Sequence, residues 1–246
     1  MKKLIAAFLL ATLPVMASAS GGNVHLEKAN IDLSNQASLQ NGAKLFVNYC
    51  LSCHSASYMR YSRMAADLGM TEAQVEQNLM FTTDKVGETM KVAMAGSDAK
   101  NWFGTKVPDL SVIGRSRGAD WLYSYLLGFY LDDSRPFGVN NIVFPDVGMP
   151  HVLGDLQGWQ KPVYVTKTGP EGKTHEVLDH LELAQAGSLS EPEYKRAVRD
   201  LVAYLVYMGE PIQLHRYGIG VWAILFLLVF TVLAYLMKKE FWKDIH

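Results

Sequence analysis

The sequence is poor in cysteine, has no internal repeat and shows no strong excess of one charge. Only two of its 246 residues are cysteines, whereas a zinc site would need further Cys or His ligands at regular spacing. Nothing repeats at a fixed period, which excludes solenoids and propellers. Residues 20–216 hold 18 Lys and Arg against 22 Asp and Glu, a net charge of −4, so nucleic acid is not expected as a partner.

The N-terminus has the form of a secretory signal peptide. Two lysines precede an apolar run over residues 4–16, and residues 17–19 (Ala-Ser-Ala) are a small-residue pattern that signal peptidase accepts. The run is shorter than the ~20 apolar residues that a bilayer-spanning helix needs. We therefore predict a signal peptide over residues 1–19 that is cleaved after Ala19.

The C-terminus contains a predicted transmembrane span. Residues 217–237 form a run of 21 residues without a charged side chain, which at ~1.5 Å per residue crosses a ~30 Å bilayer core as a helix. Lys238, Lys239 and Lys243 follow at once, and only Arg216 lies close on the other side. Because positive charge stays on the cytoplasmic side, the C-terminus is expected in the cytoplasm.

The signal peptide and the charge bias lead independently to one topology, in which the main domain lies outside the cytoplasm. The chain divides into four predicted segments. They are the signal peptide (1–19), the main domain (20–216), the transmembrane anchor (217–237) and the cytoplasmic tail (238–246).

Helical periodicity occurs in four places of the main domain. In the first, residues 41–49, the side chains of Ala43, Phe46 and Val47 share a face with Cys50, so a helix should lead directly into the first cysteine. The second helix is expected over residues 70–79 with Thr71 as its cap, and the third over the aromatic-rich residues 119–130. The fourth should begin at a capping box formed by Ser190 and Glu193 and end at Gly209 and Pro211. Its apolar stripe consists of residues 201, 204, 205 and 208.

Gly and Pro mark the segments between these helices. Loops are expected over residues 104–108, 132–150 and 154–172. Residues 163–177 alternate around a Gly-Pro-Glu-Gly turn, which predicts a short hairpin. The expected fold is therefore mainly α, with long loops, a short hairpin and one C-terminal transmembrane helix.

The two cysteines lie in Cys50-Leu51-Ser52-Cys53-His54, the C-x-x-C-H pattern of c-type haem attachment. On one helical turn the two thiols can add to the two haem vinyl groups while the adjacent imidazole points at the iron. The histidine has to follow the second cysteine directly, because a single turn reaches the iron only from that position. The motif predicts a c-type cytochrome domain with one covalent haem c, and His54 as its proximal iron ligand.

Three other interpretations of the cysteine pair are less favourable. A disulfide across two residues closes a very small loop and stabilises little. A thioredoxin-like thiol pair is expected after a strand, whereas here a helix leads in. A zinc site would need further Cys or His ligands at regular spacing, and the sequence has no third cysteine. Haem attachment is therefore preferred.

The sixth iron ligand is usually methionine or histidine, and Met/His ligation raises the reduction potential relative to His/His. Met149 lies in Val147-Gly148-Met149-Pro150, an irregular segment in which glycine lets the backbone approach and proline fixes it. His151 is its nearest rival. Filling both axial positions leaves no site for substrate, so electron transfer remains. The other methionines, mostly expected in the core, are Met59, Met64, Met70, Met80, Met90, Met94 and Met208.

Short stretches along nearly the whole chain carry a family resemblance. After the C-x-x-C-H motif they are, in order, Phe81-Thr82-Thr83, Pro108-Asp109-Leu110-Ser111, residues 115–118, Asp120-Trp121-Leu122-Tyr123, Met149-Pro150, Gly209-Glu210-Pro211, and the anchor with Lys238, Lys239 and Trp242. Every c-type cytochrome shares C-x-x-C-H, so the order of the others makes the resemblance specific. The sequence resembles cytochrome c1, the haem subunit of the cytochrome bc1 complex, in its shorter bacterial form.

The resemblance implies roles for individual residues. Cys50 and Cys53 would hold the haem, with His54 as the proximal and Met149 as the distal ligand. Two further haem contacts are implied: Arg117 at a haem propionate, and Pro108 in the segment against the haem. Val107 stands where the family has the first of two prolines. Without the family, Arg117 would be interpreted as a surface arginine.

The resemblance also implies partners. In the family, the electron arrives from the Rieske iron-sulfur protein and leaves to a soluble or membrane-bound cytochrome c, while cytochrome b oxidises the quinol. The chain would be an electron-transfer subunit of ubiquinol-cytochrome c oxidoreductase without a substrate-turnover site of its own. It would lie in the bacterial inner membrane with a periplasmic haem domain. Its anchor would pack against cytochrome b, with Gly218, Gly220 and Ala223 as small residues at that contact.

Three alternatives stay open. A stand-alone membrane-tethered carrier would dock transiently to an oxidase and would not purify with cytochrome b. A haem sensor or haem enzyme would have an open or displaceable sixth position and would bind carbon monoxide when reduced. A membrane-anchored thiol oxidoreductase would hold no haem.

Overall fold

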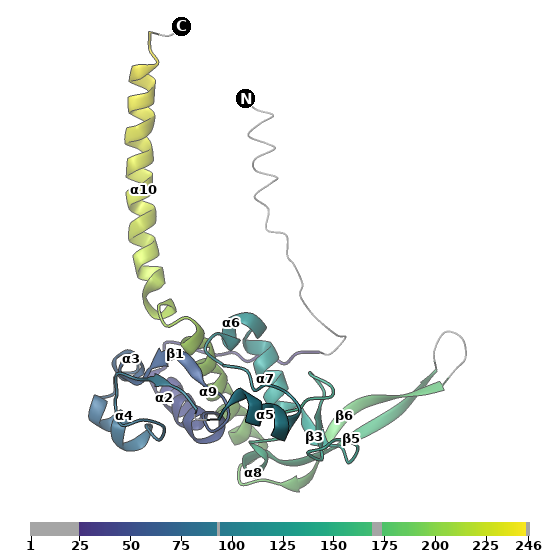
Figure 1. Ribbon diagram of the computed structural model, residues 1–246. Coiled ribbons are helices and arrows are strands. Elements are labelled where there is room, and N and C mark those ends of the chain that lie inside the picture. The colour runs from purple at the N-terminus through teal and green to yellow at the C-terminus, as the bar shows by residue number, and fades with distance from the viewer. Residues whose placement is uncertain (1–24, 93, 169–173, 245–246) are drawn as a thin grey trace.

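The computed structural model describes residues 25–92, 94–168 and 174–244 of the chain (Figure 1). Figure 1 shows a body of helices from which two extended parts leave in different directions, a two-stranded ribbon and a single long helix. The signal peptide predicted over residues 1–19 lies outside the described residues, so its cleavage after Ala19 stays a prediction.

Two packed helices, α2 (Gln36–Leu45) and α9 (Glu191–Gly209), form the centre of the body. Their backbones approach closely at Gly42, where a Cβ atom would lie 2.1 Å from the carbonyl oxygen of Asp200. Glycine is required at this crossing, because any side chain would separate the two helices. The core of the protein therefore depends on a contact between segments that are far apart in the sequence.

The helix predicted over residues 41–49 is present, but it begins earlier than predicted. Asn35 caps α2 by accepting a hydrogen bond from the Ser38 backbone N–H at 3.1 Å. Polar residues on the exposed side of this first part hid the helix from the periodicity. Beyond α2 the chain continues as a π-helical turn, η1 (Phe46–Cys50), and the predicted apolar face, which includes Phe46 and Cys50, is buried.

Helix α9 confirms the best-specified prediction. The Ser190 backbone N–H donates to the Glu193 carboxylate at 3.0 Å within a capping box, and the helix ends at Gly209 ahead of Pro211. The predicted apolar stripe of this helix is buried, with Leu201, Tyr204, Leu205 and Met208 facing the core.

Shorter elements surround the central pair. The helices are α3 (Tyr61–Asp67), α4 (Glu72–Asn78), α5 (Gly96–Phe103), α6 (Ile113–Arg117), α7 (Ala119–Leu127) and α8 (Gly154–Gln157). The short strands are β1 (Ala56–Arg60), antiparallel to β2 (Thr89–Met90), and β3 (Phe129–Leu131), antiparallel to β4 (Val139–Asn141). Helix α4 confirms the prediction over residues 70–79, including Thr71 as its cap.

Other boundaries differ from the predictions. The helix predicted over residues 119–130 ends at Leu127, because the next residues turn at Gly128 and pair as β3 with β4. A Cβ atom at Gly128 would lie 2.6 Å from the Ile142 side chain, so glycine allows this close approach. The loop expected over residues 132–150 thus contains a strand.

The predicted hairpin is present and is longer than predicted. Strand β5 (Gly158–Thr168) pairs antiparallel with β6 (Thr174–Ala186), whereas the alternation predicted only residues 163–177. The prediction of a loop over residues 154–172 is therefore wrong, because α8 and β5 occupy most of this segment. Two register shifts break the alternation near the base and middle of the ribbon, which is why the outer part alone was recognised.

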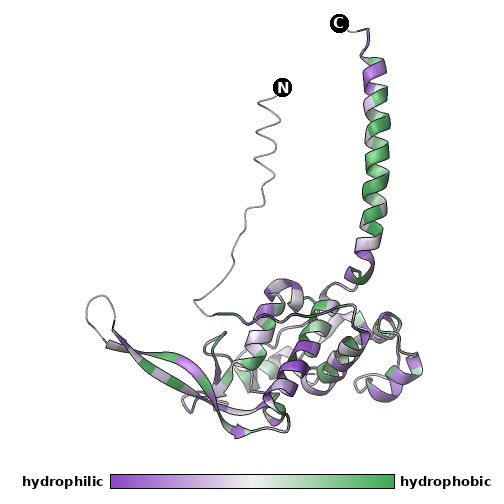
Figure 2. Ribbon diagram, turned by 180° about the vertical axis from the view of Figure 1, so that it is seen from behind, coloured by the Kyte–Doolittle hydropathy of each residue, from purple (hydrophilic) through white to green (hydrophobic). Residues whose placement is uncertain are grey.

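The long helix is α10 (Gln213–Phe241), 29 residues that include the predicted span 217–237. None of its residues is buried, and Figure 2 shows hydrophobic residues along most of its length. Within the part of the chain that the structure describes, it is the single helix long and apolar enough to cross a membrane. The fold is thus a mainly helical domain with one apolar C-terminal helix, as predicted.

Candidate functional site

A single tight turn brings the residues of the C-x-x-C-H motif together. The Leu51 backbone N–H donates to the Phe46 carbonyl at 2.9 Å, which closes the wide π-helical turn η1. The His54 backbone N–H then donates to the Cys50 carbonyl at 2.8 Å. The two cysteines and His54 therefore follow one another on a continuous coil, as the attachment of a macrocycle requires.

The two cysteines form no disulfide, and Cys50 is buried while Cys53 is half-buried. Burial, and then the neighbouring Cys53, raise the pKa of the Cys50 thiol to about 12. Disulfide exchange and metal binding both use the thiolate, so this environment disfavours the redox and zinc interpretations. Among the described residues there is also no group of three or more His, Cys, Asp and Glu side chains that could hold a metal ion.

His54 is oriented by a backbone carbonyl. Its Nδ1 atom lies 2.7 Å from the Pro108 oxygen, so Nδ1 carries the proton and donates it, and Nε2 is left with its lone pair. Burial lowers the pKa of His54, while the contact with Pro108 and the charge of Asp109 raise it by less. The ring is therefore neutral, which is the form that binds a metal.

The segment that carries Pro108 is tied to the segment that follows His54. The Leu110 backbone N–H donates to the Ser55 carbonyl at 2.8 Å. The Asp109 carboxylate accepts from the backbone N–H of Ser57 at 3.0 Å and of Ser111 at 2.8 Å. These hydrogen bonds fix the Pro108 carbonyl against His54 and give the Pro-Asp-Leu-Ser stretch a physical role.

An apolar cavity opens beside His54. Its empty volume is about 1070 Å³, part of which is open to solvent, and a smaller adjoining cavity measures about 410 Å³. Both are lined by His54, Thr105, Pro108, Gly148 and Met149. The larger is also lined by Cys50 and by apolar or aromatic side chains, chiefly Leu110, Trp121, Tyr125, Phe144, Leu201 and Leu205, and the smaller by Cys53 and Phe103.

These residues fit a haem. A neutral histidine with a free Nε2 atom and a methionine line both of these adjoining apolar cavities, and each cavity is lined by one of the two cysteines; the larger has the size of a cofactor pocket. Met149 lines both cavities, whereas none of the other methionines of the domain lines either of them. Gly148 allows the approach, since a Cβ atom there would lie 3.3 Å from the Thr105 side chain.

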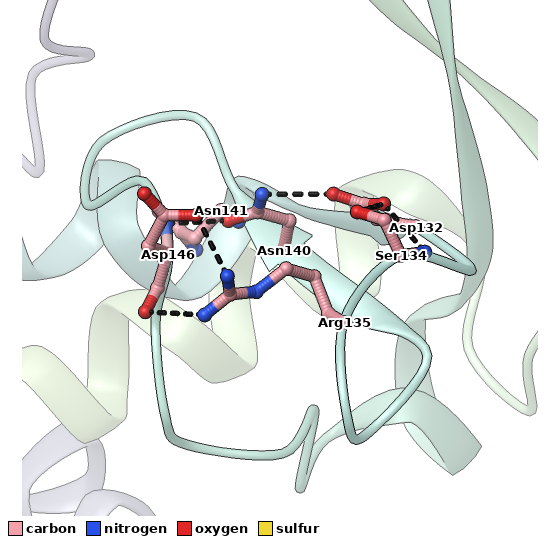
Figure 3. Close-up of polar contacts among 6 residues, drawn as sticks. All are labelled: Asp132, Ser134, Arg135, Asn140, Asn141 and Asp146. Atoms are coloured by element: carbon pink, nitrogen blue, oxygen red, sulfur yellow. Dashed lines mark hydrogen bonds and ion pairs between the residues drawn. The ribbon is translucent and has the colours of Figure 1, made fainter.

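The segment before Met149 is held by a network of polar side chains (Figure 3). The Arg135 guanidinium donates to the Asp146 carboxylate at 2.8 Å and to the Asp146 carbonyl at 2.9 Å. Asp146 has a φ of 61°, a left-handed conformation that the network supports. Asp132 closes the neighbouring turn by accepting from the Ser134 backbone N–H at 3.0 Å.

Two asparagines complete this network. Asn140 donates to the Asp132 carboxylate at 2.9 Å and accepts from the Asp146 backbone N–H at 2.9 Å. Asn141, which is fully buried, donates to the Tyr125 carbonyl at 2.8 Å. Its oxygen accepts from the backbone N–H groups of Val143 and Phe144 at 2.9 and 3.1 Å. These contacts could not be predicted from the sequence, because asparagines in a Gly- and Pro-rich segment indicate only turns.

His151, the rival of Met149, points elsewhere. Its ring stacks on Phe129 with 4.8 Å between centroids and meets Trp159 edge-on at 5.7 Å. Burial lowers the pKa of His151 to about 4, partly offset by Gln157 and Gly158. It lines neither cavity, so the structure does not bring it together with His54.

Arg117 and several aromatic residues form another part of the wall of the larger cavity. The Arg117 guanidinium lies over the Trp121 ring at 4.8 Å from its centroid, and Trp121 stacks on Tyr125 at 5.0 Å. The Tyr125 hydroxyl donates a hydrogen bond to the Met149 sulfur at 3.3 Å. Burial raises the pKa of Tyr125, so this hydroxyl keeps its proton. Sequence reasoning missed Tyr125, although its i, i+4 spacing from Trp121 on a predicted helix was visible.

Comparison with known proteins identifies the family. Residues 27–157 and 187–245 match the Cytochrome C1 family. The chain is 52% identical to a cytochrome c1 of Allochromatium vinosum over the whole of both chains. It is 47% identical to a protein of Nitrosomonas europaea named ammonia monooxygenase gamma subunit, covering 100% of this chain and 98% of that one. A cytochrome c1 of Rhodospirillum rubrum is 23% identical over 99% and 97% of the two chains. The chain therefore belongs to the cytochrome c1 family, whose members carry one covalently bound haem c.

Proposed function

We propose that this chain accepts electrons from a Rieske iron-sulfur protein and passes them to a cytochrome c. Membership of the cytochrome c1 family makes it a haem c electron carrier and the electron-transfer subunit of a bc1 complex. The single observation that best supports the proposal is that His54 and Met149 line both of two adjoining cavities, of which the larger is also lined by Cys50 and the smaller by Cys53.

In this proposal Cys50 and Cys53 would hold the haem covalently, and His54 and Met149 would bind its iron. The haem iron supplies the chemistry by changing between two oxidation states one electron at a time. Pro108 keeps the His54 imidazole in the correct tautomer through the contact of 2.7 Å. Because His54 and Met149 would both bind the iron, the chain would have no position for a substrate of its own.

The side chains of the cavity walls affect the access of water and the charge beside the proposed haem. Apolar side chains from α7 and α9, including Leu122, Leu201 and Leu205, line the cavity and limit the access of water to it. Arg117 brings a positive charge to the wall, and we propose that it pairs with a haem propionate. Exclusion of water and partial neutralisation of charge both limit the reorganisation that accompanies a change of oxidation state.

The proposed topology has the haem domain in the periplasm and the C-terminus in the cytoplasm. It is supported by the lysines at the end of α10 and by the unburied apolar surface of that helix. We propose that α10 packs against cytochrome b. Gly218 and Gly220 have open space around them in this chain, which leaves room for a neighbouring helix to approach closely.

The test combines spectra, haem retention and activity in membranes that carry the wild type or Met149→His. A covalent haem should survive denaturing electrophoresis. The wild type should have the weak thioether-to-iron band near the red end of the spectrum, and Met149→His should lose it together with quinol to cytochrome c activity. A mutant that keeps band and activity would show that another residue holds the iron, and loss of haem on denaturation of the wild type would refute the attachment.

The name of the Nitrosomonas europaea relative favours a second candidate, a subunit that supplies electrons to a membrane oxygenase. A stand-alone carrier predicts no stable partner at all. Affinity purification of the full-length chain from mild detergent distinguishes the bc1 subunit, the oxygenase subunit and the stand-alone carrier. Co-purification with cytochrome b and a Rieske protein supports the bc1 role, whereas co-purification with an oxygenase, or of the chain alone, contradicts it.

A further inference from the structure

Tyr125 has a contact that the ligand set does not require. Its hydroxyl donates to the Met149 sulfur at 3.3 Å, and this is its one hydrogen bond among the described residues. A phenol in a half-buried position usually finds an oxygen or nitrogen acceptor, because sulfur is a weak one. The pairing with sulfur therefore points to a role for the hydroxyl at Met149 itself.

Tyr125 is held in place by two contacts of its ring and one of its backbone. It stacks on Trp121 with centroids 5.0 Å apart and ring planes at 10°, and it meets Phe129 edge-on at 5.2 Å. The Tyr125 carbonyl accepts from the fully buried Asn141 amide at 2.8 Å. Asn141 belongs to the network that shapes the segment before Met149. Donor and acceptor are thus positioned by the same set of contacts.

The hydrogen bond is compatible with iron ligation. A thioether sulfur has two lone pairs, so one can bind iron while the other accepts from the hydroxyl. A donated hydrogen bond draws electron density from sulfur and weakens its donation to iron. Oxidised iron depends on that donation more than reduced iron does, so the bond should favour the reduced state.

We propose that Tyr125 is a positioning residue that holds the Met149 sulfur at the iron and raises the reduction potential of the haem through the O–H···S hydrogen bond. The inference rests on the proposed role of Met149 as sixth ligand. In this proposal the reduction potential of the haem depends on Tyr125 in α7 as well as on the C-x-x-C-H motif and the two iron ligands.

The test is Tyr125→Phe, which removes the hydroxyl and keeps the ring stack. The matched control is Tyr194→Phe, because the Tyr194 hydroxyl is also buried but donates to the Leu126 carbonyl at 2.9 Å, away from the sulfur. Met149→His is measured beside them. Each variant is titrated in native membranes with redox mediators, following the reduced haem band and the thioether-to-iron band of the oxidised form.

Tyr125→Phe should shift the equilibrium at least threefold toward the oxidised haem, a fall of about 30 mV, since a tenfold change corresponds to 59 mV for one electron. Tyr194→Phe should leave the potential unchanged. Loss of the thioether band in Tyr125→Phe, with the haem retained, would support a holding role for the hydroxyl even more strongly.

Two outcomes overturn the proposal, and they are distinguishable. If Met149→His loses the thioether band but Tyr125→Phe keeps the wild-type potential, the ligand is right and the role of Tyr125 is wrong. If Met149→His keeps the band, or the wild type lacks it, the ligand assignment fails and the role of Tyr125 fails with it.

Discussion

The helical body and the β5–β6 ribbon are stabilised in different ways. In the body, backbones touch: a Cβ atom would lie 2.1 Å from the nearest atom of α9 at Gly42, and 2.7 Å at Gly114. The ribbon is held by its own strand pairing and leaves Tyr164 and Leu183 51% and 58% exposed. The match to the Cytochrome C1 family stops at residue 157 and resumes at 187, so it omits the ribbon.

The site belongs entirely to the body. None of the described residues of β5 and β6 lines either cavity, whereas Leu201 and Leu205 of α9 line the larger one. The ribbon is anchored at its base, where the Gln160 amide donates to the carbonyls of Leu127 and Phe129 at 2.9 and 2.8 Å. Changes inside the body should therefore disturb haem binding, and changes in the outer ribbon should not.

The largest effect is expected from Gly114→Ala in α6. The added Cβ atom would lie 2.7 Å from the Val206 Cα atom and 2.8 Å from the Leu205 carbonyl oxygen, so α6 and α9 must separate. We expect a loss of about 3 kcal/mol in the free energy of unfolding, measured by urea unfolding of the full-length chain in detergent.

The matched control for this prediction is Gly87→Ala, since nothing lies within 4 Å of the corresponding Cβ position. It should change the free energy of unfolding by less than about 0.5 kcal/mol. Equal effects of the two substitutions would mean that the close α6–α9 approach does not stabilise the body.

The second effect is expected from Asn141→Ala. The change removes one of the two donors to the Tyr125 carbonyl and leaves the backbone N–H groups of Val143 and Phe144 without their partner. Leaving these part-buried N–H groups unpaired should lower the free energy of unfolding by about 2 kcal/mol. The segment before Met149 should also loosen, which weakens the thioether-to-iron band. Asn78→Ala on the exposed surface of α4 serves as control, and a band of full strength in Asn141→Ala would contradict the role of the network.

These contacts mark the limit of what the sequence predicts. Elements with a local signature were predicted well, such as α9 with its capping box and α4 with the Thr71 cap. The three-residue strands β3 and β4 are too short for a pattern. Tyr125 was not foreseen, because its role depends on a partner 24 residues away that only the folded chain brings close.

A smaller, pH-dependent effect is expected at Asp120 in the first turn of α7. Its carboxylate accepts from the Lys28 ammonium at 2.7 Å and from the Ala29 backbone N–H at 2.9 Å, and these contacts lower its pKa below the ordinary value of 3.8. The stabilisation is therefore complete above the unfolded pKa and is lost as the pH falls through the lower folded value.

Asp120→Asn should reduce the free energy of unfolding by about 1 kcal/mol at pH 7, because one oxygen still accepts and solvent screens the charge. The difference from wild type should disappear toward pH 2. Urea unfolding across this range, with Glu76→Gln as an exposed control, checks the prediction. A difference that persists at low pH would point to a packing effect rather than to the carboxylate charge.

The smallest effect is expected from shortening the ribbon. Gln160 and Leu183 lie directly opposite each other, so residues 161–182 can be replaced by Asn-Gly, which favours a two-residue hairpin turn. The base, with its Gln160 hydrogen bonds, is retained. Haem content and reduction potential should match the wild type, and the free energy of unfolding should change by less than about 0.5 kcal/mol. A loss of haem or a change in its reduction potential would mean that the ribbon supports the site through the body and that the two regions are not independent.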